Sequence, residues 1–305
     1  MRHSFFCVII FLTFFQTAST QPPRKHWEAV AYNNKSKELA VFSGAEFPGT
    51  GFTVTDSLWL FDQKWRFVDN NDIQGRWAHS MVFHEDALYT YGGFRLNESN
   101  QEIVLHDLQV FTNGRWTHVT DGPGFRKSSL FSTGSGLSLA GIMSAGDSLR
   151  FESWQLNNNK LSKTFERTLS ADINVVEILL VKSQHILVVS SEAGMILLNA
   201  ESGEKVMIKN APRSEKYAIA YDSGSDSYFV FGGLLPEDRY SDELWQIKDG
   251  IAKKLSAPDH PSPRASCHLI AIPEGLILYG GSEPGGKLNN DLWYYNGKNW
   301  SKELY

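Results

Sequence analysis

The chain has 305 residues, two cysteines and a formal net charge of -5. A mildly acidic chain has no bulk attraction for nucleic acids or for anionic membranes, so neither is an expected partner. Cys7 lies in a segment that we expect to be removed, which leaves Cys267 as the single cysteine and excludes an intramolecular disulfide. We expect Cys267 to be a buried, inert thiol.

Residues 1–20 have the pattern of a secretory signal peptide. Arg2 stands near the start, residues 5–15 are almost entirely apolar, and residues 17–20 are small. The apolar run is too short to span a bilayer, and no later stretch is long and apolar enough to do so. An uncleaved anchor is the weaker alternative. We therefore expect a secreted, extracellular protein without a membrane span, in which residues 21–305 form the mature domain.

Residues 88–116 contain the pattern that organises the rest of the chain. The apolar run 88–91 ends in Gly92-Gly93, a second run follows at 107–111, and Asn113-Gly114 precedes Trp116. Short apolar runs bounded by turn formers predict strands, and Asn-Gly between two such runs predicts a tight hairpin. The stretch therefore predicts three consecutive antiparallel strands.

This pattern recurs six times. The first small residue after the apolar run falls at positions 43, 92, 140, 190, 232 and 280. The period of roughly 42 to 50 residues is typical of propeller blades. The second run returns at 58–61, 153–156, 195–198, 244–247 and 292–295, and a closing tryptophan stands at 65, 116 and 300. The predicted blades are approximately 25–69, 76–120, 126–168, 171–210, 215–257 and 264–305.

A double glycine after an apolar strand, followed by Asp-Leu-Trp and a further tryptophan, resembles the kelch repeat. The second, fifth and sixth copies match well, the first has Ser43-Gly44 for the glycine pair, and the third and fourth are placed by spacing alone. The resemblance implies an all-β fold, a six-bladed β-propeller of four-stranded antiparallel kelch-type blades. An unrelated β-sandwich is a poor rival, because three features keep phase along the chain. Each blade should be one contiguous repeat, with blade one packed on blade six.

The predicted topology separates two faces of the propeller. The connections between strands two and three are long, at 45–57, 94–107, 142–152, 234–243 and 282–291, and only blade four closes tightly, at 192–194. The turns between strands three and four are short. Long loops on a rigid scaffold are where recognition tends to occur, so we expect the functional face on their side.

The same face receives the residues that open each first strand, and five of six copies begin with a basic residue. In kelch propellers of ubiquitin-ligase adaptors, arginines at this position grip acidic peptides, so the resemblance implies an anion-binding ring. With two residues of the long loops added, the candidate ligand-binding residues are Arg76, Arg126, Lys216, Arg264, Arg95 and Arg239. In the alternative interpretation these residues pair with Asp56, Asp107, Asp242 or Asp291 and lock the repeats together. Ligand groups should be exposed and unpaired, whereas locking groups should be buried and paired.

Three sequons fit an exported protein, and their asparagines, Asn34, Asn97 and Asn299, are candidate glycosylation sites. Asn34 and Asn97 lie in predicted loops, whereas we expect the packing of Trp300 to make Asn299 less accessible. The histidines form no close-spaced metal motif, and no nucleophile elbow or P-loop is present, so we expect no metal, cofactor or catalytic residue. His79 and His268 are interpreted as satisfied polar groups.

Three functional classes remain. We favour a secreted, monomeric, non-catalytic kelch-propeller binding module for an extracellular protein or an anionic glycan. The alternative is a carbohydrate-active propeller enzyme, because exported six-bladed kelch proteins of bacteria include sialic acid mutarotases. Galactose oxidase also has kelch-like blades, but its copper site needs ligands that Cys267 alone does not supply. A structural secreted protein is the third class, and the sequence gives no positive sign of it.

Overall fold

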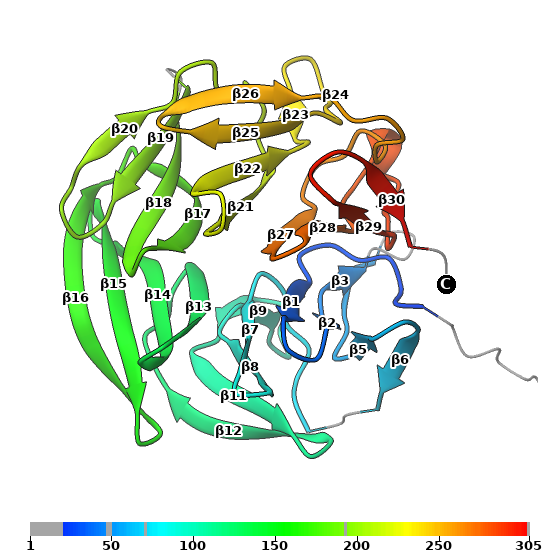
Figure 1. Cartoon of the computed structure of the whole chain (residues 1–305). Coiled ribbons are helices and arrows are strands. Elements are labelled where there is room, and N and C mark those ends of the chain that lie inside the picture. The colour runs from blue at the N-terminus through cyan, green and yellow to red at the C-terminus, as the bar shows by residue number, and fades with distance from the viewer. Residues whose placement is uncertain (1–20, 47–50, 70–71, 192–193, 304–305) are drawn as a thin grey trace, which may run out of the picture.

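The computed structural model describes residues 21–46, 51–69, 72–191 and 194–303. These residues form six four-stranded antiparallel sheets arranged around a central axis (Figure 1). The predicted six-bladed propeller with four-stranded blades is therefore confirmed. The signal peptide predicted at residues 1–20 lies outside the described residues.

Within each blade the strands follow one another outward from the axis in chain order (Figure 1). Blade one consists of β1 (Ala29–Asn33), β2 (Glu38–Phe42), β5 (Leu58–Phe61) and β6 (Trp65–Val68). Blade two consists of β7 (Ser80–His84), β8 (Ala87–Tyr91), β11 (Asp107–Thr112) and β12 (Arg115–Asp121). Blade three consists of β13 (Lys127–Thr133), β14 (Gly136–Ala145), β15 (Ser148–Asn157) and β16 (Lys160–Ser170). Blade four consists of β17 (Asn174–Val181), β18 (Gln184–Ser191), β19 (Gly194–Asn199) and β20 (Lys205–Met207). Blade five consists of β21 (Ala218–Asp222), β22 (Ser227–Phe231), β25 (Leu244–Lys248) and β26 (Ile251–Leu255). Blade six consists of β27 (His268–Ile272), β28 (Gly275–Tyr279), β29 (Leu292–Tyr295) and β30 (Trp300–Lys302). Middle strands such as β5 are buried on both faces, since each sheet is sandwiched between two neighbours.

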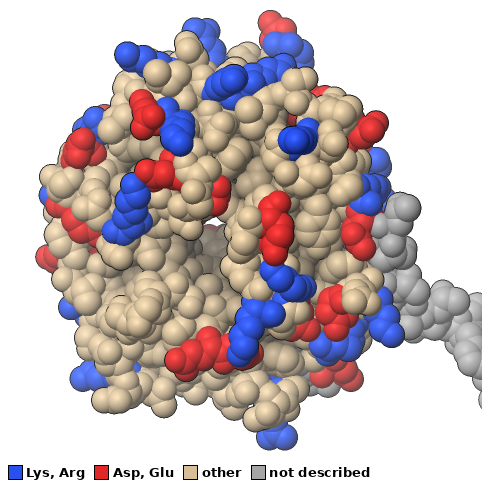
Figure 2. All heavy atoms as spheres, in the orientation of Figure 1, with Lys and Arg blue, Asp and Glu red and all other residues tan. Residues whose placement is uncertain are grey.

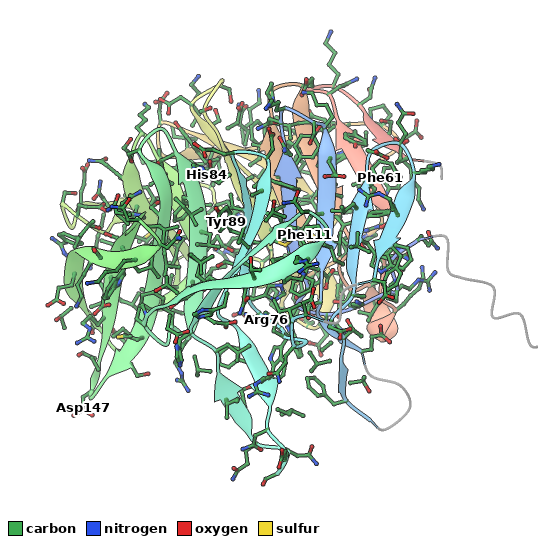
Figure 3. The ribbon with its side chains drawn as sticks, turned by 90° about the horizontal axis from the view of Figure 1, so that it is seen from below. Phe61, Arg76, His84, Tyr89, Phe111 and Asp147 are labelled. Carbon is green, nitrogen blue, oxygen red and sulfur yellow. The ribbon has the colours of Figure 1, made fainter. Side chains whose placement is uncertain are left out.

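The two faces differ as the antiparallel topology predicts. On the loop face, the long connections fold into small sheets or a helical turn: β3 (Ala45–Glu46) with β4 (Thr53–Val54), β9 (Phe94–Leu96) with β10 (Glu102–Val104), β23 (Leu234–Leu235) with β24 (Arg239–Tyr240), and η1 (Pro284–Gly286). The turn face carries the connections between strands one and two. In Figure 3 His84 of a β7–β8 turn lies in the upper half, whereas Arg76 and Asp147 of the loop face lie lower. Figures 1 and 2 look onto the turn face.

Blade three departs from the expected loop at 142–152. These residues continue β14 and β15 as one long hairpin, paired from Ser138↔Gln155 to Ala145↔Ser148. In the blades that match the repeat well, strand two ends at glycines with positive φ, such as Gly92 and Gly93. Blade three has no such kink at Ala140-Gly141, and the ring of Phe125 packs where a Cβ of Gly141 would lie. The ladder therefore runs on.

The closing tryptophans join neighbouring blades. Trp116 packs against Phe42 of blade one with 4.9 Å between ring centroids, and Trp300 packs edge-on against Phe231 of blade five at 5.6 Å. Trp65 of blade one lies 5.9 Å from Tyr279 of blade six. In each pair the second residue directly precedes the small-residue pair of the earlier blade. Each tryptophan also packs on an aromatic ring of its own strand three, at 5.0 to 5.3 Å, so it stabilises the interface between blades as well as its own sheet.

Blade one closes the ring by packing on blade six. Their apolar side chains form a single cluster that includes Leu39, Trp59, Ile277 and Leu292. The Asn290 side-chain amide of blade six also donates a hydrogen bond to the Pro22 carbonyl, which holds the segment before β1. Among the described strands none is shared between the first and last blades. Side-chain packing, not a strand ladder, therefore joins the two ends.

Candidate functional site

Arg76 and Arg264 are buried and paired, which matches the locking interpretation. The side chains of Arg76 and Arg264 are 2% and 1% exposed. Arg76 donates to both carboxylate oxygens of Asp107, at 3.0 and 2.9 Å, and Arg264 donates to those of Asp291, at 2.6 and 3.2 Å. Each also donates to the first carbonyl of its glycine pair. The expectation that these two residues offer exposed, unpaired charges to a ligand is therefore wrong.

The repeat pattern explains these pairs. The acid stands at the start of strand three, as the first residue of β11 for Asp107 and directly before β29 for Asp291. It also accepts a hydrogen bond from the residue two positions later, the Gln109 amide for Asp107 and the Trp293 indole for Asp291. Burial alone would raise the pKa of Asp107, but the hydrogen bonds and charge of Arg76 outweigh it and hold that pKa below its usual range. The arginine thus connects the entry of strand one to the start of strand three.

The register of the predicted ring is also corrected. Lys216, Ala78 and Ser266 share a positive φ, of 51°, 52° and 53°, at the kink before strand one. Counting back two residues from each shows that the position of Arg76 is filled in blade five by Ser214. Lys216 is exposed at the kink and is not equivalent to the buried arginines.

In blade one the arginine position is taken by Lys25. Its ammonium donates to the hydroxyls of Thr55 and Ser57, and Ser57 stands where other blades have the acid. Burial lowers the pKa of Lys25 to about 8. Lys25 is therefore also a buried internal group rather than part of an exposed ring.

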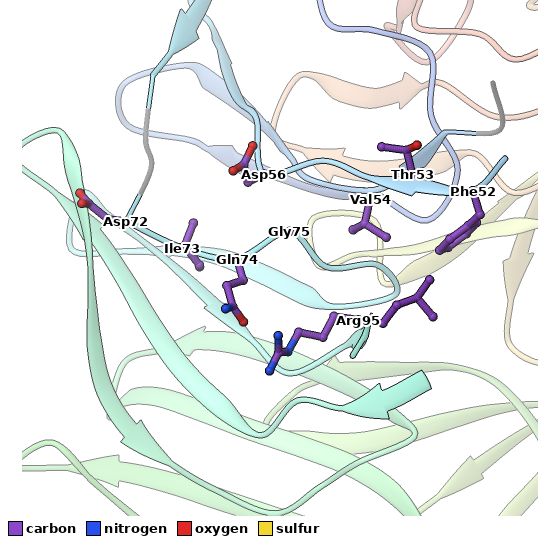
Figure 4. A pocket seen from close by; sticks show the side chains of 10 residues that line it. Phe52, Thr53, Val54, Asp56, Asp72, Ile73, Gln74, Gly75 and Arg95 are labelled. Atoms are coloured by element: carbon purple, nitrogen blue, oxygen red, sulfur yellow. The ribbon is translucent and has the colours of Figure 1, made fainter. Parts of the chain in front are cut away.

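Arg126 and Arg239 are exposed on the loop face, whereas Arg95 is half-buried and lines a cleft. The cleft has a volume of about 610 Å³ and lies between residues 52–56 of blade one, residues 72–75 before blade two, and β9. In Figure 4 the side chain of Arg95 extends along the cleft toward Gln74, with Asp56 and Asp72 at the opposite wall and Phe52 at one end. The ring has thus not assembled, but one predicted arginine stands in a cleft.

Aromatic packing and one close backbone approach build this cleft. Phe52 packs edge-on against Trp77 at 5.1 Å, and Trp77 stacks on Phe94 of β9 at 6.1 Å. A Cβ on Gly75 would lie 2.6 Å from the Thr55 carbonyl oxygen, so only glycine lets the two segments meet there. Packing between the loop of blade one, the segment before β7 and the β9–β10 hairpin therefore forms the walls.

The guanidinium of Arg95 has no partner among the described residues. Its Nε is buried and unbonded, and no hydrogen bond or ion pair joins the guanidinium to any residue within the described ranges. A buried donor without a partner costs free energy that an incoming acceptor recovers. In this respect Arg95 differs from Arg76 and Arg264, whose terminal nitrogens are both bonded.

A second polar cluster lies where blades six, one and two meet on the loop face. Oε1 of Glu28 is 3.9 Å from Nε2 of His268, and the two side chains are 4% and 30% exposed. Burial raises the pKa of Glu28 to about 7, and burial lowers the pKa of His268 to about 4. The pair therefore combines a carboxyl group that titrates near neutrality with a neutral imidazole.

His79 is the neighbouring buried histidine, and its ring packs edge-on against Phe42 at 5.3 Å. Both of its ring nitrogens are buried without a hydrogen-bond partner among the described residues, so the expectation of a satisfied histidine is wrong. Burial, followed by the charge of Arg76, holds the pKa of His79 well below its usual range. Sequence reasoning missed Glu28, which occupies the same position after the kink as His79 and Cys267.

Glu28 gives a testable pH dependence. Because its folded-state pKa of about 7 exceeds the ordinary value of 4.5, its contribution to stability falls as the pH rises from about 4.5 to about 7. Glu28→Gln should therefore be more stable than the wild type by about 3 kcal/mol at pH 8 and equally stable at pH 4. Urea denaturation at both pH values measures this difference. A difference that stays constant between them would show that ionisation of Glu28 is not coupled to folding.

The remaining expectations concern the thiol and the sequons. Cys267 is buried, and burial raises its pKa to about 12, so the expectation of a buried, inert thiol is confirmed. Asn34 and Asn299 lie in exposed turns, and Asn97 is half-buried in the β9–β10 hairpin. The concern that Trp300 hides Asn299 is wrong, because Trp300 turns inward while Asn299 stays exposed. Whether any sequon carries a glycan remains a prediction.

Neither a metal-binding cluster nor a membrane-spanning helix is found among the described residues. No group of three or more His, Cys, Asp or Glu side chains within them is placed to hold a metal ion. No helix in the described part of the chain is long and apolar enough to cross a membrane.

Comparisons with known proteins support the architecture. A scan against models of protein families finds no match, and neither does a search of curated proteins. Among solved structures, one titled "Structure of YjhT" aligns with a TM-score of 0.67 and 14% sequence identity, over 93% of this chain and 98% of that chain. At this identity the likeness shows the propeller fold alone, and membership of the kelch family remains a prediction.

Proposed function

We propose that this protein is a secreted binding module that recognises an anionic glycan on its loop face, with Arg95 as the anchor for the acidic group. The observation that carries this proposal is the guanidinium of Arg95, which has no partner within the described ranges and lies in a cleft of about 610 Å³. A carboxylate or sulfate placed against it would form charge-assisted, bidentate hydrogen bonds.

The other cleft residues favour a glycan over a uniformly acidic peptide. Phe52 offers an apolar surface at one end, and the carboxylates of Asp56 and Asp72 can accept hydrogen bonds from hydroxyl groups. The same two carboxylates would repel a second negative charge on a ligand. A sugar with one acidic group and several hydroxyls therefore fits this arrangement best.

Replacement of Arg95 by alanine is expected to weaken glycan binding roughly 10- to 100-fold, because a hydrogen bond to a charged group contributes about 1.5–3 kcal/mol. Sialylated, uronate-containing and sulfated glycans, together with acidic peptides, would be screened by array and titrated by calorimetry. Arg115→Ala, an exposed arginine on the outer strand β12, is the matched control and should bind as the wild type does. Equal affinity of the Arg95 and Arg115 variants would refute the anchor, and capture of acidic peptides alone would replace the glycan by a protein ligand.

Export is part of this proposal and is tested on the same material. Protein made in a eukaryotic secretory host should appear in the medium, and mass spectrometry should find that about twenty residues have been removed. Glycosidase treatment should lower its mass if any of the three sequons is used. Cytosolic protein that retains Met1 would contradict export.

A carbohydrate-active enzyme is the second candidate, and the Glu28–His268 pair is the observation that favours it. A carboxyl group with a pKa of about 7 can both give and take a proton at neutral pH, as the opening and closing of a sugar ring requires. It ranks second because Glu28 is almost fully covered. NMR of freshly dissolved sialic acid would decide, since a rate of anomer exchange equal to that in buffer removes this candidate.

A further inference from the structure

The turn face has a cavity of its own at the axis of the propeller. It has a volume of about 660 Å³ and is lined by residues from the ends of all six first strands, β1, β7, β13, β17, β21 and β27. Figure 2 looks onto this face and shows the surface hollowed at the centre of the ring. The volume lies within the range of pockets that hold small molecules. This cavity is on the opposite face from the Arg95 cleft.

The wall of this axial cavity combines aromatic and aliphatic side chains with polar ones such as Asn33 and Asn34. It includes Phe83, Phe131, Leu180 and Tyr221, which come from four different blades. Two polar groups of the wall are already satisfied, because the Tyr221 hydroxyl donates to Asp226 at 2.6 Å and the Ser132 hydroxyl pairs with His84 at 2.9 Å. The aromatic and aliphatic side chains from four blades therefore offer a contact surface for an apolar or aromatic body.

The rim is acidic and is connected between blades. The six turns between strands one and two, at 33–38, 84–87, 133–136, 181–184, 222–227 and 272–275, contain three lysines and six carboxylates. Each lysine pairs with a carboxylate of a neighbouring blade: Lys35 with Asp86, Lys37 with Glu274, and Lys182 with Asp226. Figure 2 shows basic and acidic side chains beside one another around the opening. The pairs hold the mouth in shape, and the excess of carboxylates leaves it negative.

Glu85 is the carboxylate that lines the cavity beside the paired Asp86. No hydrogen bond or ion pair joins its side chain to another residue in the described part of the chain. It therefore contributes an uncompensated negative charge next to aromatic rings. Aromatic faces and a nearby carboxylate together attract a cation more strongly than either does alone, because a concave apolar site focuses the field.

We propose that the axial cavity binds a small organic cation, a primary amine or quaternary ammonium ion with an aromatic or branched apolar body. The apolar body contacts the aromatic wall, and the cationic group lies at the rim beside Glu85. This site is independent of the Arg95 cleft, since it lies on the other face and selects the opposite charge.

Phenethylammonium and phenylpropionate are suitable probes, because they share an apolar ring and carry opposite charges. Calorimetry and ligand-observed NMR would be run on protein without a glycan at Asn34, because Asn34 lines the cavity mouth. The cation should bind saturably, with a dissociation constant of about 1 mM or tighter for a ligand of this size. Its affinity should fall as salt is added, and the acid should bind at least tenfold more weakly.

Two variants locate the binding. Glu85→Gln should lower the affinity for the cation about threefold or more. Glu237 is an exposed carboxylate near the β23–β24 hairpin of the loop face, and Glu237→Gln should leave that affinity unchanged. Ala271→Phe fills the cavity from β27 and should abolish binding while the unfolding midpoint stays high. Three results would each overturn the site. Phenylpropionate could bind as tightly as phenethylammonium, or phenethylammonium could fail to bind at about ten times the expected dissociation constant. A folded Ala271→Phe variant could also still bind the cation.

Discussion

Replacement of Arg76 by alanine is expected to lower the free energy of unfolding by about 3–5 kcal/mol, because it leaves the largely buried Asp107 carboxylate without its cationic partner. The loss should also extend to the Gly92 carbonyl, which would no longer receive the 3.2 Å hydrogen bond from Arg76. Chemical denaturation of the purified variant at pH 7 measures the change.

Arg126→Ala is the matched control, since Arg126 also precedes a first strand but is exposed, and its effect should stay within about 0.5 kcal/mol. The pKa of Asp107 is held below its usual range in the fold, so the contribution of its ionised form is present above pH 4 and is lost as the solution is acidified further. The difference in free energy of unfolding between the wild type and Arg76→Ala should therefore become smaller at low pH. An unchanged denaturation midpoint for Arg76→Ala would return this residue to the ligand-binding set.

The sequence predicted the propeller because its signals are local and repeat in phase. The small-residue pair kinks the chain after strand two in four blades, the closing tryptophan marks strand four in three, and the regular spacing places the other two blades. The same logic explains the error at 142–152, where spacing placed the small pair of blade three at Ala140-Gly141. Neither residue has a positive φ, and the strand therefore continues into a long hairpin. Blade three, which lacks the glycine pair, therefore keeps the spacing of the repeat, but it has a hairpin where blades one, two, five and six have a loop.

The candidate sites were harder to predict because they depend on contacts between distant segments. The pairing of Arg76 with Asp107 spans 31 residues and was one of two open interpretations. The sequence alone places Lys216 two residues away from the arginine position, because the kink before strand one is occupied by residues as different as Ala78, Lys216 and Ser266 and so has no signature. The sequence indicates Arg95 only as an arginine of a long loop, because its cleft depends on contacts of Gly75 and Trp77 that no pattern of charge indicates.

Replacement of Trp300 by alanine should destabilise the protein by about 3–5 kcal/mol, the range seen when a buried tryptophan is truncated. Trp300 is 4% exposed, and its ring lies 5.1 Å from Tyr295 of its own blade and 5.6 Å from Phe231 of blade five. It stands on β30, the last strand, and no strand described in the structure crosses from blade one to hold that strand in place. Its packing therefore has a large share in attaching the end of the chain to the ring.

Ser301→Ala is the matched control, because Ser301 is the exposed neighbour of Trp300 on the same strand and should change stability by less than about 0.5 kcal/mol. Both variants would be made in a bacterial host, because Ser301→Ala removes the Asn299 sequon whereas Trp300→Ala keeps it. Thermal and urea unfolding should show the full loss for Trp300→Ala, and truncation before Trp300 should cost at least as much, because it removes the ladder of β30 as well. Wild-type stability in the truncated chain would mean that the ring is closed by contacts other than the packing of its last strand.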